Sequence, residues 1–143
     1  LIHNSEHLFS KIKEASSLSG IKNMLTVEAN DYWHYHYLLD EEVGYKVKTL
    51  GKQMIDNIII NTIVPIVFSY GLHHGEEVFK EKAIQWLEET APEKNTITKG
   101  FEKLNYNNRN AFDSQAFIQL KNEYCNQKLC LQCAIANSIL KKS

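Results

Sequence analysis

Three cysteines are crowded into one short segment of the chain, as Cys125, Cys130 and Cys133. Thiolates at this C-x4-C-x2-C spacing can bind zinc or an iron–sulfur cluster, because both prefer sulfur ligands. A closed zinc site needs four ligands, so a histidine from elsewhere in the chain would have to complete it. The candidates for that fourth ligand are His3, His7, His34 and His36.

The segment between the cysteines contains neither glycine nor proline. On one continuous helix Cys125 and Cys130 would point about 140° apart, so a metal site would require a break near Asn126. Free cysteine is also a common small apolar residue of protein cores. We therefore expect the three thiols to lie near one another around a tight turn, buried and without metal. A zinc or iron–sulfur site is the alternative.

The densest group of aromatic and histidine residues is the stretch 31–37, D-Y-W-H-Y-H-Y. If this stretch is extended, His34 and His36 lie on one face and, with Trp33, could bind a metal or line a pocket. The preferred interpretation is a packed aromatic segment, extended or helical, with partly exposed histidines. Trp33, His34 and His36 are the candidate binding residues.

No sequence motif of a known catalytic class is present. Walker, G-x-G-x-x-G, H-E-x-x-H and G-x-S-x-G patterns are all missing. Asp113 and Ser114 precede an apolar helical stretch, where residues of these types usually cap the helix. Whether the protein is an enzyme therefore stays open.

Charge and composition argue against two classes of partner. Sixteen basic residues oppose seventeen acidic ones, and Arg109 is the only arginine. Bidentate recognition of phosphate and of guanine edges relies on the guanidinium group, so we do not expect nucleic-acid binding. The apolar stretch from Ile55 to Phe68 is short and contains polar residues, so we expect no membrane span. The odd cysteine count and the lack of a visible signal peptide favour the cytoplasm.

The element that organises the predicted fold is a helix from Leu50 to about Tyr70. It has one apolar face and a second apolar stripe nearly opposite, which is typical of a central helix packed on both sides. Pro65 should kink it, because proline lacks a donor and crowds the preceding turn. The first face contains positions 55, 58, 59, 62, 63, 66, 67 and 70, and the second contains Ile60, Val64 and Phe68.

Shorter helices are predicted around this one. They cover about residues 5–15, 21–25, 76–89, 95–104, 113–124 and 131–140, with Asn95 as a cap and with loops at 71–75 and 105–110. The predicted fold class is all-α, a compact multi-helix bundle around a central, Pro-kinked apolar helix. The length fits a single helical domain over residues 1–143.

Several phrases of the sequence resemble a known family. They are Leu50-Gly51-Lys52, the stretches 55–65, 68–71 and 113–120, Tyr124-Cys125 with 130–133, and Tyr32-Trp33 followed by His36-Tyr37. The family is an uncharacterised bacterial one, common in Bacteroidetes and catalogued as domain of unknown function 2851. The resemblance implies that this chain corresponds to the C-terminal part of longer proteins. It also implies an N-terminal part suggestive of a restriction-endonuclease-like nuclease core.

The function expected from these observations is that of an accessory or structural domain of a larger protein. Its partner would be the N-terminal domain of the same protein. One alternative is a self-standing protein-interaction module, which could form a homo-oligomer. A further alternative is part of a nuclease-like enzyme with a metal site ligated by Cys125, Cys130 and Cys133.

Overall fold

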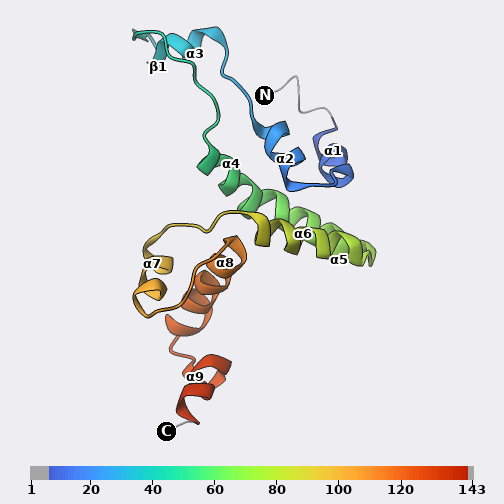
Figure 1. Cartoon of the computed structure of the whole chain (residues 1–143), viewed down its shortest axis with the longest axis vertical. Coiled ribbons are helices and arrows are strands. Elements are labelled where there is room, and N and C mark those ends of the chain that lie inside the picture. Colours follow the sequence, from blue (N-terminus) through green and yellow to red (C-terminus); the bar gives the residue numbers. More distant parts are fainter. Residues whose placement is uncertain (1–6, 142–143) are drawn as a thin grey trace. The chain divides into compact units, whose positions relative to one another are not determined.

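The structure, a computed structural model, describes residues 7–141 and divides into two units, Leu1–Trp86 and Leu87–Ser143 (Figure 1). Helices dominate both units, and the sheet within the described residues is one antiparallel pair of short strands. The predicted all-α fold class is therefore confirmed. The single domain expected from the chain length stays a prediction. The candidate ligand His3 and the predicted helix start at Ser5 lie outside the described residues.

Unit 1 is built around one long helix. Its elements in chain order are α1 (Leu8–Glu14), α2 (Leu18–Leu25), α3 (Asp31–Tyr35), β1 (His36–Leu38), β2 (Glu41–Glu42), α4 (Lys52–Ile58), the π-helical η2 (Ile59–Ile63), α5 (Val64–His74) and α6 (Glu77–Glu89). The parts α4, η2 and α5 follow one another without interruption and form the long helix predicted from the sequence.

The long helix carries the core of unit 1. Four of its residues spaced four apart are buried, together with two more on another face: Ile55, Ile59, Ile63 and Val67, then Ile60 and Val64. The helix is thus packed on two sides, as predicted. Three residues assigned to the apolar stripes are exposed instead: Thr62, Ile66 and Phe68. Thr62 and Ile66 line a cavity together with Ile63 and Val67, so they lie on the predicted face but beside a cavity that α1 and α2 leave open.

The π-helical turn η2 ends at Ile63, two residues before Pro65. The N–H of Val64 donates to the carbonyl of Ile59, five residues earlier, instead of four. In a regular helix the proline ring would collide with the carbonyl four residues back and leave that carbonyl without its donor. A π-helical turn is a common way for a helix to absorb such a defect.

Contacts around Tyr70 attach α1 and α6 to α5. The Lys13 ammonium donates to the Tyr70 hydroxyl at 3.3 Å and lies 4.4 Å from the ring centroid. The edge of the Tyr70 ring also meets Phe9 of α1 and Phe79 of α6, with centroids 5.6 and 5.1 Å apart. The Lys82 ammonium of α6 donates to the carbonyl of Lys13 at 2.8 Å. These three helices are therefore joined by both polar and aromatic contacts.

The turn between α5 and α6 differs from the prediction. His73 and His74, expected in a loop, lie in the last turn of α5, which ends at Gly75 with φ of 70°. Glycine adopts this left-handed conformation without strain and commonly ends helices. Gly71 was interpreted as a helix breaker, but it lies inside α5 and is buried. A side chain there would collide with the backbone that leads into α6.

Unit 2 contains shorter helices. They are α7 (Thr96–Lys103), α8 (Ala111–Gln119), its π-helical continuation η3 (Leu120–Cys125), the 3-10 turn η4 (Cys130–Gln132) and α9 (Ala134–Leu140). The rings of Phe101 and Phe117 stack 4.7 Å apart and join α7 to α8. All the predicted helices of this region are present, with ends shifted by a few residues.

The predicted cap of α7 is confirmed and that of α8 is wrong. The Asn95 side chain accepts the Thr98 N–H at 3.0 Å, and the Thr98 hydroxyl accepts the Asn95 N–H at 3.1 Å, which completes a capping box. At α8 the cap is Asn110, whose side chain accepts the N–H of Asp113 at 3.0 Å. Asp113 and Ser114, the predicted caps, lie inside the first turn of the helix and bind other groups.

Ser114 is fully buried and anchors the loop before α7. Its hydroxyl oxygen accepts the N–H of Glu93 at 2.9 Å. The Glu93 carbonyl in turn accepts hydrogen bonds from the Thr98 hydroxyl at 3.0 Å and the Asn108 amide at 3.1 Å. The buried hydroxyls of Thr98 and Ser114 are thus satisfied within one network, as buried polar groups must be.

Asp113 forms a two-pronged ion pair with Arg109. The guanidinium Nε and Nη2 lie 2.8 and 3.1 Å from the two carboxylate oxygens, and the Arg109 backbone N–H donates to Oδ2 at 3.1 Å. The hydrogen bonds from the Arg109 side chain are the main cause that lowers the pKa of the Asp113 carboxyl from its usual 3.8. The folded state therefore favours the ionised carboxylate.

This pair predicts a pH-dependent difference between wild type and Asp113→Asn. Because the pKa is lower in the folded than in the unfolded state, the carboxylate stabilises the protein at neutral pH. The contribution disappears as the pH falls through the folded-state pKa. Urea unfolding should therefore find Asp113→Asn less stable at neutral pH and equal to wild type in acid. A difference that does not change with pH would contradict this expectation.

Candidate functional site

The candidate residues Trp33, His34 and His36 lie in residues 30–48, a segment that we call the aromatic arm. It consists of α3, β1 and β2. Two extended segments lead to it side by side, and their backbones are hydrogen-bonded to each other (Figure 1). The arm is helical through Tyr35 and extended from His36 onward, so both alternatives for this stretch are partly correct. His34 and His36 would lie on one face only if the chain were extended at both residues. Because His34 is in α3, the structure does not place them in that way.

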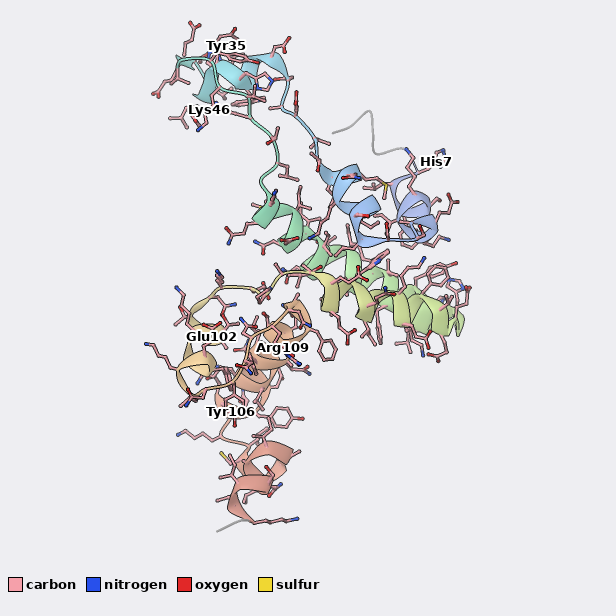
Figure 2. All side chains as sticks on the ribbon, viewed as in Figure 1. His7, Tyr35, Lys46, Glu102, Tyr106 and Arg109 are labelled. Carbon is pink, nitrogen blue, oxygen red and sulfur yellow. The ribbon has the colours of Figure 1, made fainter. Side chains whose placement is uncertain are left out.

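His34 is the anchor of the arm, with 6% of its surface exposed. The N–H of Lys48 donates to its Nδ1 at 3.1 Å, and the N–H of Lys46 donates to its carbonyl at 2.9 Å. Figure 2 shows the side chains of the arm, with Tyr35 and Lys46 labelled. Since Nδ1 accepts a hydrogen bond, a neutral His34 carries its proton on Nε2. The edge of its ring meets Tyr45, with centroids 5.6 Å apart. These contacts give His34 a structural role in joining the two sides of the arm.

His36 belongs to a separate set of contacts. Its ring stacks on Tyr32 with centroids 3.9 Å apart, and its Nδ1 donates to the Tyr32 carbonyl at 2.8 Å. The Lys48 ammonium donates to the His36 carbonyl and lies 3.5 Å from the centroid of the Tyr37 ring. In residues 7–141 no three His, Cys, Asp or Glu side chains are grouped as a metal site requires. The two histidines thus order the arm separately.

The surface of the arm is unusually apolar. Of its residues only His34 is buried, while nine large apolar side chains are exposed: Tyr32, Trp33, Tyr35, Tyr37, Leu38, Leu39, Val43, Tyr45 and Val47. Single exposed apolar residues are normal on protein surfaces, but a contiguous group marks an interaction site. The geometry therefore widens the candidate site from three residues to most of the arm.

Several of these side chains are held in place before any partner binds. Tyr32 packs against Trp33 edge to face at 5.1 Å, and its hydroxyl accepts the N–H of Asp40 at 3.2 Å. Tyr35 and Tyr45 face each other across the arm with centroids 5.2 Å apart. Ordered aromatic side chains lose little conformational freedom on binding. The arm is therefore suited to binding a complementary surface.

Sequence reasoning missed most of this surface for an identifiable reason. Aromatic residues at high density usually indicate a core, which favours the interpretation of this stretch as packed. The available signal was the lack of a helical or alternating period from Tyr32 to Val47, combined with four carboxylates and only two lysines in residues 30–48. A segment without one buried face cannot bury all its apolar side chains.

The cysteines are arranged differently from the prediction. The predicted break is present, because η3 ends at Cys125 and the chain turns through Lys128, which has φ of 57°. Cys133 is buried with 7% of its surface exposed, whereas Cys125 and Cys130 are exposed, so the expectation of three buried thiols is wrong for these two. The turn carries two thiols to the surface because unit 2 packs little against it. The metal-free state stays a prediction.

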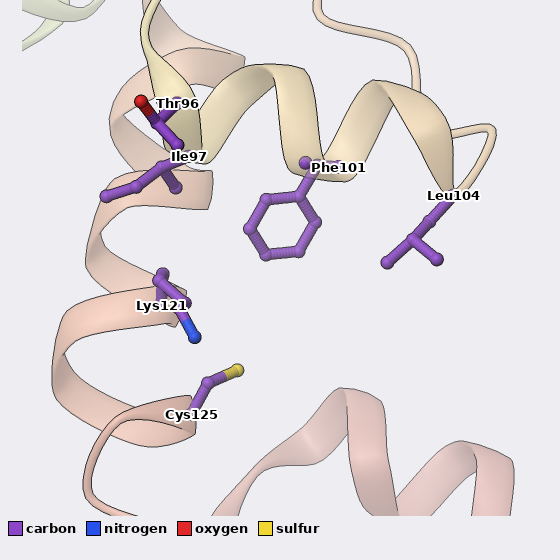
Figure 3. A pocket seen from close by; sticks show the side chains of 7 residues that line it. Thr96, Ile97, Phe101, Leu104, Lys121 and Cys125 are labelled. Carbon is purple, nitrogen blue, oxygen red and sulfur yellow. The ribbon is translucent and has the colours of Figure 1, made fainter.

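Unit 2 contains an apolar pocket of about 360 Å³ between α7 and η3. Phe101 and Leu104 line one side, and Lys121 and Cys125 project toward it from the other (Figure 3). Ile97, Gly100 and Thr96 complete the lining. The volume is within the usual range for small-molecule sites, and Lys121 supplies one positive charge at an otherwise apolar wall.

One helix of the described part, Lys52–His74, is long and apolar enough to span a membrane by length and composition alone. This helix is longer than the apolar stretch from Ile55 to Phe68, on which the expectation of no membrane span was based. Of its most apolar window, 39% is buried inside the protein, and the core helix of a soluble protein passes the same test. The expectation of no membrane partner stays a prediction.

Comparison with known proteins gives one match. A family profile described as "Protein of unknown function (DUF2851)" matches residues 1–96. These residues contain the aromatic arm and the long helix. They therefore also contain the phrases between Tyr32 and Gly71 that resemble the family. The phrases at 113–120 and 124–133 lie outside the matched residues. No curated protein and no solved structure matches the chain.

Proposed function

The chain belongs to the DUF2851 family of proteins of unknown function, and we propose that it is a helical accessory domain that binds another part of a larger protein through the aromatic arm. The observation that supports this role is the exposure of nine large apolar side chains in residues 30–48, where only His34 is buried. Such a surface has no use in holding unit 1 together.

The chemistry of the arm is that of a protein interface. Tyrosine and tryptophan are enriched at interfaces because each combines a large apolar body with a hydrogen-bonding group. Burial of apolar surface gives about 25 cal/mol per Å², and the ordered rings limit the entropy lost on binding. The arm therefore offers both a driving force and a defined shape.

The charge of the arm indicates the chemistry of its partner. Four carboxylates, those of Asp31, Asp40, Glu41 and Glu42, lie in the arm among its apolar residues. Only two lysines oppose them, and Lys48 is occupied by the His36 carbonyl and the Tyr37 ring. We therefore expect an apolar partner surface edged with lysine or arginine. The same acidic excess disfavours nucleic acid as the partner.

The runner-up function is a self-standing interaction module that uses the same arm to bind a second copy of the chain. In this function burial of the arm would depend on protein concentration, because self-association requires two molecules. In the accessory role it would not, because the contact forms within one protein. The nuclease-like alternative rests on the sequence resemblance alone.

A pair of matched double variants tests the proposal. Leu38→Ser with Leu39→Ser changes two arm residues that are 60% and 71% exposed. Leu72→Ser with Val78→Ser is the control, since these residues are 64% and 59% exposed and lie outside the arm. Both pairs should leave the unfolding of the isolated chain within about 0.5 kcal/mol of wild type, as surface substitutions do.

In the larger protein the two variants should differ. Loss of the arm contact should expose the arm to protease, so the arm variant should be cleaved faster than wild type in limited proteolysis. The control variant should be cleaved at the same rate as wild type. Equal cleavage of all three proteins would refute the accessory role. Loss of a concentration-dependent dimer of the isolated chain in the arm variant alone would instead favour the self-standing module.

A further inference from the structure

Cys130 and Cys133 form a C-x-x-C pair at the two ends of one turn. Cys130 begins the 3-10 turn η4 and Cys133 directly follows it, where its N–H donates to the carbonyl of Cys130 at 3.2 Å. Such a bond between residues three apart closes a turn whose ends have Cα atoms less than about 7 Å apart. Disulfides form across Cα separations of about 4.4–6.8 Å. The turn thus presents two thiols at a spacing that a disulfide can bridge.

The turn is held from both sides. On the N-terminal side the N–H of Leu129 donates to the carbonyl of Tyr124 at 3.0 Å. On the C-terminal side the Asn137 side chain donates to the carbonyl of Leu131 at 2.9 Å, and its backbone N–H donates to the carbonyl of Cys133 at 2.9 Å. These bonds hold the backbone in place around the two thiols.

The two thiols differ in access to solvent. Cys130 is exposed, whereas Cys133 is buried. This is the division of roles that a thiol–disulfide exchange pair needs, because an accessible thiolate attacks the incoming disulfide and a shielded neighbour resolves the adduct. Cys125 is separate from the pair, since it ends the preceding helix and lines the pocket beside Lys121 (Figure 3).

We propose that Cys130 and Cys133 form a thiol–disulfide exchange site whose substrate is a small-molecule disulfide such as oxidised glutathione. The Cys130 thiolate attacks one sulfur of the substrate, the substrate S–S bond breaks, and one thiolate leaves and takes up the proton that Cys130 lost. The Cys133 thiolate then attacks the Cys130 sulfur, and the second substrate thiolate leaves and takes up the Cys133 proton. The protein gains one disulfide and loses two electrons and two protons, all of which pass to the substrate.

This site is independent of the role proposed for the aromatic arm. The two proposals rest on different residues in different units of the chain. A failure of one therefore leaves the other standing.

The test is oxidation of the reduced chain. Protein freed of metal with a chelator and of reductant by desalting is incubated with oxidised glutathione, its remaining thiols are alkylated, and mass spectrometry maps the products. Wild type should lose two hydrogen atoms per chain, with a Cys130–Cys133 crosslink and an alkylated Cys125. Cys125→Ser is the control and should form the same crosslink.

The single variants separate the two roles. Cys133→Ser should keep a glutathione adduct on Cys130, because no neighbouring thiol resolves it. Cys130→Ser should lose the crosslink and react slowly at Cys133. Circular dichroism of each reduced variant verifies the fold. A wild-type product that retains glutathione on Cys130, crosslinks Cys125, or contains no disulfide would overturn the proposal.

Discussion

Ile59→Ala is expected to lower the free energy of unfolding by roughly 2–5 kcal/mol, the usual cost of truncating a well-packed isoleucine. Ile59 has no exposed surface and begins the π-helical turn of the long helix. Its neighbours Ile55 and Ile63, one turn away on either side, are buried as well. Truncation would therefore leave a cavity that the surrounding helices cannot close without moving.

The matched control is Ile66→Ala in the same helix. Ile66 is 49% exposed, so the same truncation there should cost much less, about 0.5 kcal/mol or below. Urea unfolding followed by circular dichroism measures both. A similar small loss for the two variants would show that Ile59 does not lie in the core.

Two glycine substitutions are expected to change stability in opposite directions. Gly71 lies inside α5, where an added Cβ would be 2.8 Å from the carbonyl oxygen of Glu76 and 3.0 Å from the backbone nitrogen of Lys80. Alanine favours a helix over glycine by up to about 1 kcal/mol. The contact is with backbone, which cannot rotate away, so the overpacking cost of roughly 1–3 kcal/mol should exceed that gain. Gly71→Ala should therefore destabilise the protein.

Gly100→Ala is the control with the opposite sign. Gly100 also lies inside a helix, α7, but nothing is within 4 Å of an added Cβ. Only the helix preference remains, and this variant should be more stable than wild type by about 0.5–1 kcal/mol. Thermal unfolding of the two variants side by side measures the difference. A stabilised Gly71→Ala would mean that α5 and α6 are not packed as closely as the structure shows.

The sequence was informative wherever local chemistry decides the structure. Residues 52–70 were predictable as part of a central helix because isoleucine and valine recur on two faces. Asn95 was predictable as a cap because its side chain can satisfy the free N–H groups at a helix start. The prediction of the α8 cap was wrong because Asn110, Asp113 and Ser114 are all of residue types that can cap a helix. Their competition is decided by the ion pair of Asp113 with Arg109 and the burial of Ser114.

The candidate site was less predictable, because burial depends on what the rest of the fold covers. Trp33 and His34 are adjacent aromatic residues, yet His34 is buried and Trp33 is exposed. The difference comes from the backbone of residues 46–48, which folds back onto His34 alone. Cys130 and Cys133 likewise differ in exposure although three positions separate them. Sequence patterns indicate which residues can carry a function, whereas packing decides which of them reach the surface.

The central claim is that another part of a larger protein covers the aromatic arm, and Trp33 can report on it directly. The chain has two tryptophans, Trp33 at 38% exposure and Trp86 at 1%, so Trp86→Phe leaves Trp33 as the only tryptophan of the chain, which can be excited at wavelengths that tyrosine does not absorb. Acrylamide quenching of this variant should be strong in the isolated chain. In the larger protein we expect weaker quenching and emission shifted to the blue at every protein concentration. Equal quenching of Trp33 in the isolated chain and in the larger protein would contradict the claim.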